Sequence, residues 1–430
     1  MVGSETPQII AGARDPATQV QPHIVVGITD PVTCLNLTGR LRALREAGFR
    51  VTLISSPGVL LELTAAREGV ASIALPMKRA IAPLADLVSL VRLWRLLCRL
   101  RPDLTEFSTP KAGLLGNLAA KLAGVPSRIY MLRGLKLESC TGIKRRILLL
   151  AERLASACAQ VVLCNSESLR TQAEALGVAG PGKLKLLGDG SSNGVNMERF
   201  SPGASDVRER LGLPPIARLV GFVGRLTRDK GVPELIEAFV TILRGDPNAH
   251  LLLVGWFDAS EDALDYHSRA CIKNHPRIHC TGFVHDPAPY YRAMDLLVLP
   301  TWREGFPNVV LEAAATGIPV ITTLCTGSRD SVVPEVTGLL IPPGYPEAIS
   351  EAVLGLLRDS PKRRRMGKAA REWVQEHYLN EHVLGRTSAY YRSLLNPAGV
   401  RKSGRPSQGI GRGSTGTGSA PACETGAWSV

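Results

Sequence analysis

The sequence lacks the cysteine and hydrophobic patterns that mark several common protein classes. Its nine cysteines include no Cys-x-x-Cys pair, so neither a structural zinc site nor a thioredoxin motif is indicated, and we expect most of them to be reduced, buried thiols. No apolar run approaches the roughly 18 residues that span a membrane. Residues 1–8 lack the charge and the apolar core of a signal peptide. We therefore expect a cytoplasmic protein.

Glycine-rich nucleotide loops and nucleic-acid motifs are also missing. The turn after the first expected strand, residues 29–33, reads Thr-Asp-Pro-Val-Thr instead of Gly-x-Gly-x-x-Gly, which disfavours a nicotinamide-binding domain. The polar residues of this turn could contact an acceptor molecule instead. Because we find no nucleic-acid recognition motif, we expect no nucleic-acid partner.

Apolar residues and positive charge, by contrast, are plentiful. A chain of 430 residues exceeds what one core usually organises, and a hydrophobic content of 45% is enough for two domains. The 51 Lys and Arg residues outnumber the 38 Asp and Glu residues, which gives a net charge of +13. This excess suits an anionic ligand or surface, such as a nucleotide diphosphate or an acidic lipid.

Strand-like and helix-like segments alternate in two series, which predicts two open parallel α/β sheets. In the first series we expect strands at residues 23–28, 51–55, 103–107, 129–132 and 161–164, and helices at 35–47, 84–100 and 114–123. In the second series we expect strands at residues 219–223, 251–254, 278–281, 296–299 and 319–322, and helices at 233–243, 290–293 and 308–316 and then onward to about residue 391. The turn-rich segment 191–196 should end the first domain.

Two carboxylates flank an expected strand-to-helix turn in the segment 301–319. Glu304 follows the apolar run 296–300, and Glu312 lies in an Ala-rich helix that Gly317 ends. Strand ends and helix starts in open α/β sheets bind phosphate, so the amides of this turn could hold a diphosphate while the carboxylates take hydroxyls on either side. A nucleotide-sugar has that layout. Alternatively, neither carboxylate binds a ligand: Glu304 is a solvated loop residue and Glu312 is an exposed residue of the helix.

A basic loop follows the first strand of the second series. The segment 221–231 reads Gly-Phe-Val-Gly-Arg-Leu-Thr-Arg-Asp-Lys-Gly. Gly224 lets the backbone approach a ligand, and Arg225 and Lys230 can supply two cations to one anion. The alternative is a basic surface loop, but this loop lies at the same expected sheet edge as Glu304, which favours a shared phosphate site.

Basic residues are concentrated in the first half of the chain. Between residues 78 and 150, fourteen Lys and Arg residues accompany four Asp and Glu residues, a local excess of +10. In the expected helix 84–100 apolar positions recur with helical spacing, and Arg92, Arg95 and Arg99 fall on another face. These arginines could form a solvated helix face or bind an anionic membrane surface, and the local excess favours the membrane.

Four motifs, taken together and in this order, resemble a known family. They are Thr-Pro-Lys-Ala-Gly-Leu-Leu-Gly from Thr109, Ser-Ser-Asn-Gly-Val-Asn from Ser191, Gly-Arg-Leu-Thr-Arg-Asp-Lys-Gly from Gly224 and Glu-Gly-Phe-Pro-Asn-Val-Val-Leu-Glu-Ala from Glu304. They resemble family 4 of the retaining glycosyltransferases, and most closely its capsular and exopolysaccharide enzymes. The likeness covers about residues 22–395.

The resemblance implies the GT-B fold, an α/β fold in which two Rossmann-like doubly wound domains face each other across a central cleft. It implies an acceptor-binding domain at residues 22–203, a nucleotide-sugar-binding domain at 204–380 and a helix at 381–395 that crosses back to the first domain. Residues 1–21 and 396–430 are expected to be disordered tails.

The resemblance also assigns roles at the donor site. It implies that Arg225 and Lys230 hold the donor diphosphate, that Glu304 contacts the hydroxyls of the transferred sugar and that Glu312 holds the ribose. Further substrate contacts are expected at Gly224, Gly305, Phe306, Pro307, Asn308, Thr109 and Lys111, and, near the base, at Phe283 and Val284. Such enzymes need no metal or other cofactor, because the cations and the helix start stabilise the leaving nucleoside diphosphate.

The sequence departs from the family at two places. Where many relatives carry histidines, this chain has Glu106-Phe107-Ser108 before the Thr-Pro-Lys turn and Arg133-Gly134 after the next strand. Arg133 cannot act as a base, but retention in this family is commonly described as front-face attack, in which the leaving phosphate takes the acceptor proton. We expect Glu106 and Arg133 to pair at the cleft in place of the histidines; alternatively, each is a solvated strand-end charge.

These features together predict a metal-independent, retaining glycosyltransferase that is cytoplasmic and peripheral at the inner face of the plasma membrane. It would transfer a sugar from a nucleotide-sugar, most simply a UDP-sugar, to a lipid-linked saccharide acceptor in surface-polysaccharide biosynthesis. One alternative is transfer to a small-molecule acceptor. Another is a non-catalytic nucleotide-sugar-binding protein, which the missing histidines allow but the intact carboxylates and cations of the donor site oppose.

Overall fold

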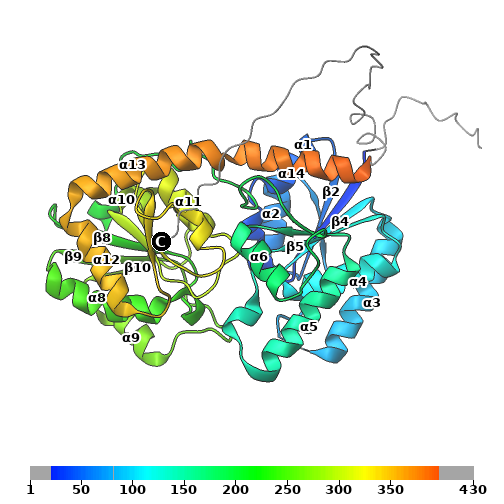
Figure 1. Ribbon diagram of the computed structural model, residues 1–430, viewed down its shortest axis with the longest axis horizontal. Coiled ribbons are helices and arrows are strands. Elements are labelled where there is room, and N and C mark those ends of the chain that lie inside the picture. Colours follow the sequence, from blue (N-terminus) through cyan, green and yellow to red (C-terminus); the bar gives the residue numbers. More distant parts are fainter. Residues whose placement is uncertain (1–20, 81, 397–430) are drawn as a thin grey trace, which may run out of the picture. The chain divides into compact units, whose positions relative to one another are not determined.

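Two parallel β-sheets, one in each half of the sequence, organise the structure (Figure 1). The computed structural model describes residues 21–80 and 82–396, so the tails expected at 1–21 and 396–430 lie outside the described residues except for residues 21 and 396. Contacts unite the described residues up to Leu395 into one compact unit. The α/β class and the two sheets predicted from the sequence are confirmed.

The first sheet has seven strands in the order β3-β2-β1-β4-β5-β6-β7. Its strands are β1 (His23–Gly27), β2 (Arg50–Ser55), β3 (Ala71–Ala74), β4 (Leu104–Ser108), β5 (Ser127–Leu132), β6 (Val161–Cys164) and β7 (Leu184–Leu186). The helices between them are η1 (Pro31–Leu37), α1 (Arg40–Glu46), α2 (Val59–Glu68), α3 (Pro83–Leu100), α4 (Pro110–Leu122), η2 (Lys136–Ser139), α5 (Gly142–Cys158) and α6 (Glu167–Ala175). Strand β4 pairs with β1 and β5 in the middle of the sheet, and all of its side chains are buried.

The second sheet has six strands in the order β10-β9-β8-β11-β12-β13. Its strands are β8 (Arg218–Val223), β9 (Ala249–Val254), β10 (Ile278–Cys280), β11 (Leu296–Leu299), β12 (Val320–Thr323) and β13 (Gly338–Ile341). The helices of this half are α7 (Val207–Arg210), η3 (Arg228–Lys230), α8 (Val232–Gly245), α9 (Tyr266–Asn274), α10 (Ala288–Ala293), α11 (Asn308–Ala315), η4 (Arg329–Ser331), α12 (Pro346–Arg358), α13 (Ser360–His377) and α14 (Asn380–Leu395).

Helix α14, the last element, packs on the first half of the chain. Figure 1 shows it beside α1, with which it is in contact. Tyr391 of α14 is fully buried in a cluster that includes Ile24 of β1 and Leu41 of α1. Since burying such side chains stabilises the folded state by roughly 1.5–3 kcal/mol each, α14 is part of the first core.

Element boundaries differ from the sequence prediction where glycine and proline redirect the chain. The single helix expected at 35–47 is divided into η1 and α1 because Gly39 between them has a φ of 78°. The helix expected at 114–123 begins earlier, at Pro110 in the Thr-Pro-Lys turn, because Pro110 occupies the first turn of α4, where its missing N–H costs no hydrogen bond. The sequence prediction also misses several elements, namely α2, β3, α5, α6, β7, α7, α9 and β13. Strand β13 lies in the stretch after residue 322 where only helices were expected, so that expectation was wrong there.

Helix α3 has the expected bounds, but much of its apolar stripe is exposed. Leu93 and Leu97 face the core, whereas Leu84, Leu87 and Val88 have exposed fractions of 84%, 58% and 49%. Within the part of the chain that the structure describes, no helix combines the length and the apolar character needed to cross a membrane.

Candidate active site

A pocket of about 410 Å³ lies where loops from the two sheets meet. The loops come from the carboxyl ends of β1, β5, β6, β8, β9 and β11, which is where open α/β sheets bind ligands. Its charged lining consists of Arg79, Arg133, Arg225, Lys230, Arg303, Asp229 and Glu304. Five basic groups against two acidic groups make the pocket attractive to an anionic ligand.

Two glycines allow these loops to approach one another. Gly231 has a φ of +72°, and a Cβ there would lie 2.0 Å from the carbonyl oxygen of Pro300, so the Lys230 loop packs directly on the end of β11. A Cβ on Gly305 would lie 2.3 Å from the carbonyl oxygen of Arg133. Because a side chain at either position would collide with the backbone, glycine is required to bring Lys230 and Arg133 to one pocket.

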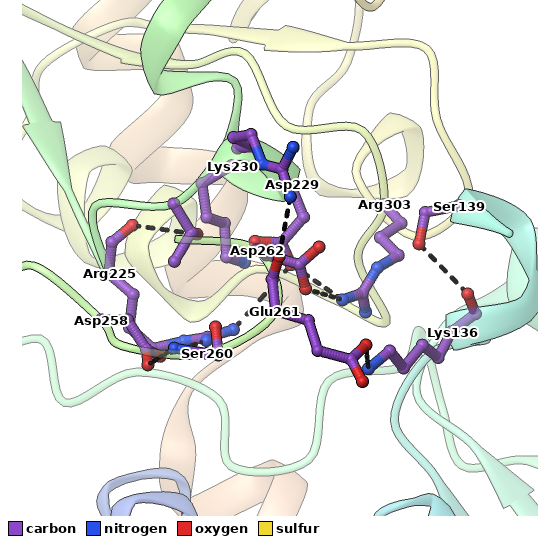
Figure 2. A network of polar contacts seen from close by, with 12 residues as sticks. Lys136, Ser139, Arg225, Asp229, Lys230, Asp258, Ser260, Glu261, Asp262 and Arg303 are labelled. Atoms are coloured by element: carbon purple, nitrogen blue, oxygen red, sulfur yellow. Dashed lines mark hydrogen bonds and ion pairs between the residues drawn. The ribbon is translucent and has the colours of Figure 1, made fainter. Parts of the chain in front are cut away.

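The two basic residues of the loop after β8 are both paired with carboxylates. The Lys230 ammonium is in direct contact with Glu304. The Arg225 guanidinium donates to Asp258 at 2.6 Å, as Figure 2 shows. Arg225 also lies 3.9 Å from Asp229. Burial lowers the pKa of Arg225, but the hydrogen bond to Asp258 and the charge of Asp229 raise it overall. An anionic ligand would compete with these carboxylates for the two cations.

Asp229 links this loop to the turn after β11. Its carboxylate accepts a hydrogen bond from Arg303 at 2.8 Å, visible in Figure 2, and its backbone carbonyl accepts one from the Thr301 hydroxyl at 3.1 Å. Burial raises the pKa of Asp229, but the charges of Arg303 and Lys230 lower it overall. Although other acids lie close by, no group of His, Cys, Asp or Glu among residues 21–80 and 82–396 is arranged to hold a metal ion.

Helix α11 begins at the pocket. The pocket lining includes Gly224 and the turn residues Gly305, Phe306, Pro307 and Asn308. Pro307 directly precedes the helix, whose first N–H groups have no acceptor within the helix. Glu312, one turn further on, is outside the lining, and its carboxylate accepts a hydrogen bond from the Tyr291 hydroxyl at 2.7 Å. Burial raises the pKa of Glu312 despite this bond.

Thr109 and Lys111, two further predicted contacts, lie outside the pocket lining. The Thr109 hydroxyl is hydrogen-bonded to that of Thr29 at 2.6 Å. The Lys111 ammonium lies 2.6 Å from the Asp86 carboxylate. Both side chains therefore hold the first turn of α4 to neighbouring segments.

Phe283 and Val284 also lie outside the lining, but Phe283 is close to it. Its ring packs edge-on against Trp256 with centroids 5.4 Å apart, and Trp256 lines the pocket. Val284 packs against the core of the second half.

Glu106 does not face the pocket, which corrects the sequence prediction. It lies in the middle of β4 and is fully buried. Its carboxylate accepts a hydrogen bond from Arg40 at 2.8 Å and another from the Tyr391 hydroxyl, while Arg133 is 4.0 Å away. The expected pair with Arg133 is thus the weaker contact, because Arg40, which no local pattern connects with Glu106, supplies the nearest charge.

Sequence reasoning missed three large side chains of the pocket. Arg303 directly precedes Glu304 in the same turn, so that motif could have indicated it. Trp256 follows β9, and its position at the end of a strand is the available signal. Arg79 follows β3 and is held 3.1 Å from Asp30, a contact that nothing in the local sequence indicates.

Two family models match the chain. The model described as "Glycosyl transferase 4-like domain" matches residues 38–190, and the one described as "Glycosyl transferases group 1" matches residues 217–359. The chain is 35% identical over 360 residues to the capsular polysaccharide biosynthesis glycosyltransferase CapM of Staphylococcus aureus, covering 84% of this chain and 94% of the relative. It is 31% identical over 273 residues to the UDP-Gal:alpha-D-GlcNAc-diphosphoundecaprenol alpha-1,3-galactosyltransferase of Escherichia coli, covering 61% of this chain and 68% of the relative.

Solved structures share the fold at lower sequence identity. Sucrose-phosphate synthase from Thermosynechococcus elongatus superposes with a TM-score of 0.73 at 22% identity, covering 87% of this chain and 100% of that one. Anabaena Alr3699/HepE in complex with UDP-glucose superposes with a TM-score of 0.71 at 19% identity, covering 86% and 99%. With the two family models and the relative from S. aureus, these likenesses show that the chain belongs to the glycosyltransferases of the GT-B fold.

Proposed function

We propose that the protein is a retaining glycosyltransferase that moves a sugar from a UDP-sugar to a lipid-linked saccharide in the biosynthesis of a capsular or similar surface polysaccharide. The observation that carries the proposal is the meeting of Arg225, Lys230 and Glu304 with the start of α11 in one pocket. Two cations, free helix-start amides and a carboxylate suit a diphosphate that bears a sugar. The names of the two relatives support the donor and acceptor classes, because one is a capsular polysaccharide enzyme and the other is named for UDP-Gal and a diphosphoundecaprenol-linked saccharide.

In this proposal the donor diphosphate replaces the carboxylates that pair with the two cations. Asp258 and Glu304 each contact one cation, and a diphosphate carries more charge than either carboxylate. Once displaced from Lys230, Glu304 is free to accept hydrogen bonds from the hydroxyls of the transferred sugar. The same carboxylate thus balances the cation before the donor binds and orients the sugar afterwards.

In the chemical step, negative charge develops on the leaving UDP as the sugar is transferred. The bond between the anomeric carbon and the β-phosphate oxygen breaks, and the acceptor hydroxyl oxygen bonds to the same face of that carbon. The hydroxyl proton passes to the departing phosphate oxygen. Arg225, Lys230 and the amides at the start of α11 stabilise the negative charge of the leaving UDP, so we propose that the reaction needs no divalent metal.

We assign the remaining donor contacts to the neighbourhood of α11 and β9. Glu312 would hold the ribose, since its carboxylate lies one turn beyond the phosphate-binding start of α11 and is oriented by Tyr291. The base would lie beside the Trp256 and Phe283 rings and the backbone of Val284, because Trp256 forms the pocket wall on that side.

A screen of nucleotide-sugars on the purified chain tests the donor assignment. We expect UDP and UDP-sugars to raise the melting temperature, since a ligand at 100 times its Kd stabilises the folded state by about 2.7 kcal/mol. One UDP-sugar should be hydrolysed or, with a lipid-linked saccharide present, consumed in transfer. ADP-sugars and GDP-sugars are the controls. No stabilisation by any nucleotide-sugar would contradict the donor assignment, whereas binding without turnover would favour a non-catalytic protein.

The first half of the chain also carries a surface suited to a membrane. On α5, Ile143, Ile147, Leu150 and Leu154 recur at the spacing of one helix face and have exposed fractions between 44% and 77%. The exposed basic residues of its first turns are Lys144, Arg145 and Arg146. On α3, exposed leucines and valine accompany Arg92, Arg95 and Arg99, which line a groove of about 390 Å³. Figure 1 shows α3 and α5 on either side of α4, which contacts both.

We propose that this α3–α5 surface binds the anionic inner face of the plasma membrane. An amphipathic helix with apolar side chains flanked by arginine or lysine lies in the headgroup region, where the cations meet lipid phosphates. Such docking would present the pocket of the chain to an acceptor whose lipid is embedded in the same leaflet.

Changing Arg92, Arg95 and Arg99 together to glutamine is expected to reduce binding to anionic vesicles roughly a hundredfold, because each basic residue near the surface contributes roughly 1 kcal/mol. Sedimentation with vesicles of phosphatidylglycerol and phosphatidylcholine measures this. High salt should also release the wild-type protein, since the attraction is screened over about 8–10 Å at ordinary ionic strength.

The matched control removes three exposed arginines from the second half, Arg358, Arg364 and Arg365. It makes the same charge change at a distance from the α3–α5 surface and should leave binding nearly unchanged. Equal losses of vesicle binding in the two triple variants would show that binding depends only on the net charge of the protein and not on the α3–α5 surface. Equal binding of the wild-type protein to neutral and anionic vesicles would remove the proposal.

A further inference from the structure

Behind the pocket wall formed by Arg133 lies a buried cluster of charged side chains from distant parts of the sequence. Arg40 of α1 donates to Glu106 at 2.8 Å, to the Tyr391 hydroxyl at 2.9 Å and to the backbone carbonyl of Ser192 at 2.7 Å. Arg133 donates to the Ser192 hydroxyl at 2.8 Å. The side chains of Arg40 and Glu106 are 1% and 0% exposed.

The charges in this cluster do not balance. Two guanidinium groups, those of Arg40 and Arg133, share the single carboxylate of Glu106. Arg40 makes the direct hydrogen bond, and Arg133 is left at 4.0 Å. Burial, and then the charge of Arg40, lower the pKa of Arg133 to about 10. The Arg133 guanidinium therefore stays charged at neutral pH, although burial and the neighbouring Arg40 disfavour its charge.

The surplus positive charge of the cluster is that of Arg133, at the pocket wall. Arg133 lines it, with a side chain that is 12% exposed. Its Nη1 group donates to Ser192, and its Nη2 group lies 4.0 Å from Glu106 on the side of the buried cluster; neither Nε nor Nη2 makes a hydrogen bond within the described residues, so the charge of this guanidinium is only partly compensated by the protein. Buried donors without partners are rare, because each one costs free energy. A guanidinium has donors in a fixed fork that matches the oxygens of a phosphate.

The position of Arg133 limits which part of a ligand it can meet. Its backbone carbonyl lies against Gly305, in the turn between Glu304 and the start of α11. Arg133 therefore lines the pocket beside the turn that carries Glu304 and leads to the start of α11, where the proposed donor diphosphate binds.

We propose that Arg133 binds a phosphate oxygen of a substrate, in addition to the two cations of the loop after β8. The inference rests on the proposed function, since it takes the pocket to hold a nucleotide-sugar and its acceptor. The oxygen can come from the departing UDP diphosphate or from the diphosphate that links an acceptor saccharide to its lipid. In either case the ligand supplies the negative charge that the buried cluster lacks.

Binding measurements on Arg133→Gln test this, with UDP and uridine as the donor probes and farnesyl diphosphate and farnesol, added to UDP-saturated protein, as the acceptor probes. If the donor diphosphate is the partner, Arg133→Gln should weaken UDP binding roughly ten- to a hundredfold and leave uridine unaffected. If the acceptor diphosphate is the partner, UDP binding should be unchanged and farnesyl diphosphate binding should fall by a similar factor, with farnesol unaffected. If neither diphosphate loses affinity, the proposal is overturned.

Two further variants separate the loss of a contact from the loss of the fold. Arg133→Lys keeps the charge without the planar fork and should retain more affinity than Arg133→Gln. Arg210→Gln, an exposed residue of α7 paired with Asp206, is the matched control and should bind both probes as the wild type does. Without ligand, Arg133→Gln should melt no lower than the wild-type protein, because it removes a disfavoured charge. Failure of the wild-type protein to bind UDP at all would instead refute the proposed function.

Discussion

Replacing Lys230 with alanine is expected to reduce turnover roughly ten- to a hundredfold and to weaken UDP-sugar binding. A charge-assisted contact to a diphosphate is worth about 1.5–3 kcal/mol, and Lys230 would keep such a contact as charge builds on the leaving UDP. The same result is expected for Arg225→Ala, because that guanidinium, although paired with Asp258, lines the same pocket. Steady-state kinetics with the UDP-sugar found in the screen measures both losses.

Arg228→Ala provides the matched control for these variants. Arg228 lies in η3 with Lys230, but its guanidinium donates to the backbone carbonyl of Glu261 and lies outside the pocket lining. It should therefore retain most of the wild-type activity. Full activity in Lys230→Ala and Arg225→Ala would remove the phosphate assignment. A chelator should leave the wild-type enzyme active, and a strict need for a divalent ion would contradict the proposed mechanism.

The parts of the site that the sequence predicts well are those in which a short segment contains both the structural and the chemical signal. The apolar run of β11, the turn around Glu304 and the Ala-rich α11 are contiguous, and the strand and helix have almost the predicted bounds. Arg225 and Lys230 lie in the loop after β8, and parallel strands end at one sheet edge. The direct contact between Lys230 and Glu304 follows from these two local patterns.

The parts that could not be predicted depend on contacts between distant segments. Arg40 and Glu106 are 66 positions apart, and Tyr391 is 285 positions from Glu106, so no spacing rule connects them. The spacing in α3 likewise shows that its residues divide between faces. It does not show that Leu93 faces the core while Leu84 faces solvent, because that depends on where α4 packs.

The buried carboxylate of Glu106 leads to the largest expected effect on stability. Glu106→Gln would keep the shape of the side chain but leave Arg40 and Arg133 without a counter-charge, and removing one partner of a buried ion pair typically costs about 3–5 kcal/mol. Urea unfolding at neutral pH should show this as a lower midpoint.

Burial raises the pKa of Glu106, but the charges of Arg40 and Arg133 lower it overall. Its stabilising contribution is therefore present above the ordinary value of 4.5 and is lost as the pH falls further.

Glu152 of α5 provides a control in the same half of the chain, because its charged carboxylate is expected to destabilise the folded state, whereas that of Glu106 stabilises it. It is also buried, but its partner is the neutral Tyr130 hydroxyl at 2.6 Å, and burial raises its pKa to about 7. Its charged form is disfavoured in the folded state, so the wild-type protein loses stability as the pH rises from about 4.5 to 7. Glu152→Gln should abolish that loss, with a gain that approaches roughly 3 kcal/mol above pH 7 and is absent below pH 4.5. Two glutamates that are both buried should thus respond oppositely to the same substitution at neutral pH, because only one has a cation beside it. Destabilisation of both variants to the same extent would mean that packing, and not charge balance, sets the effect.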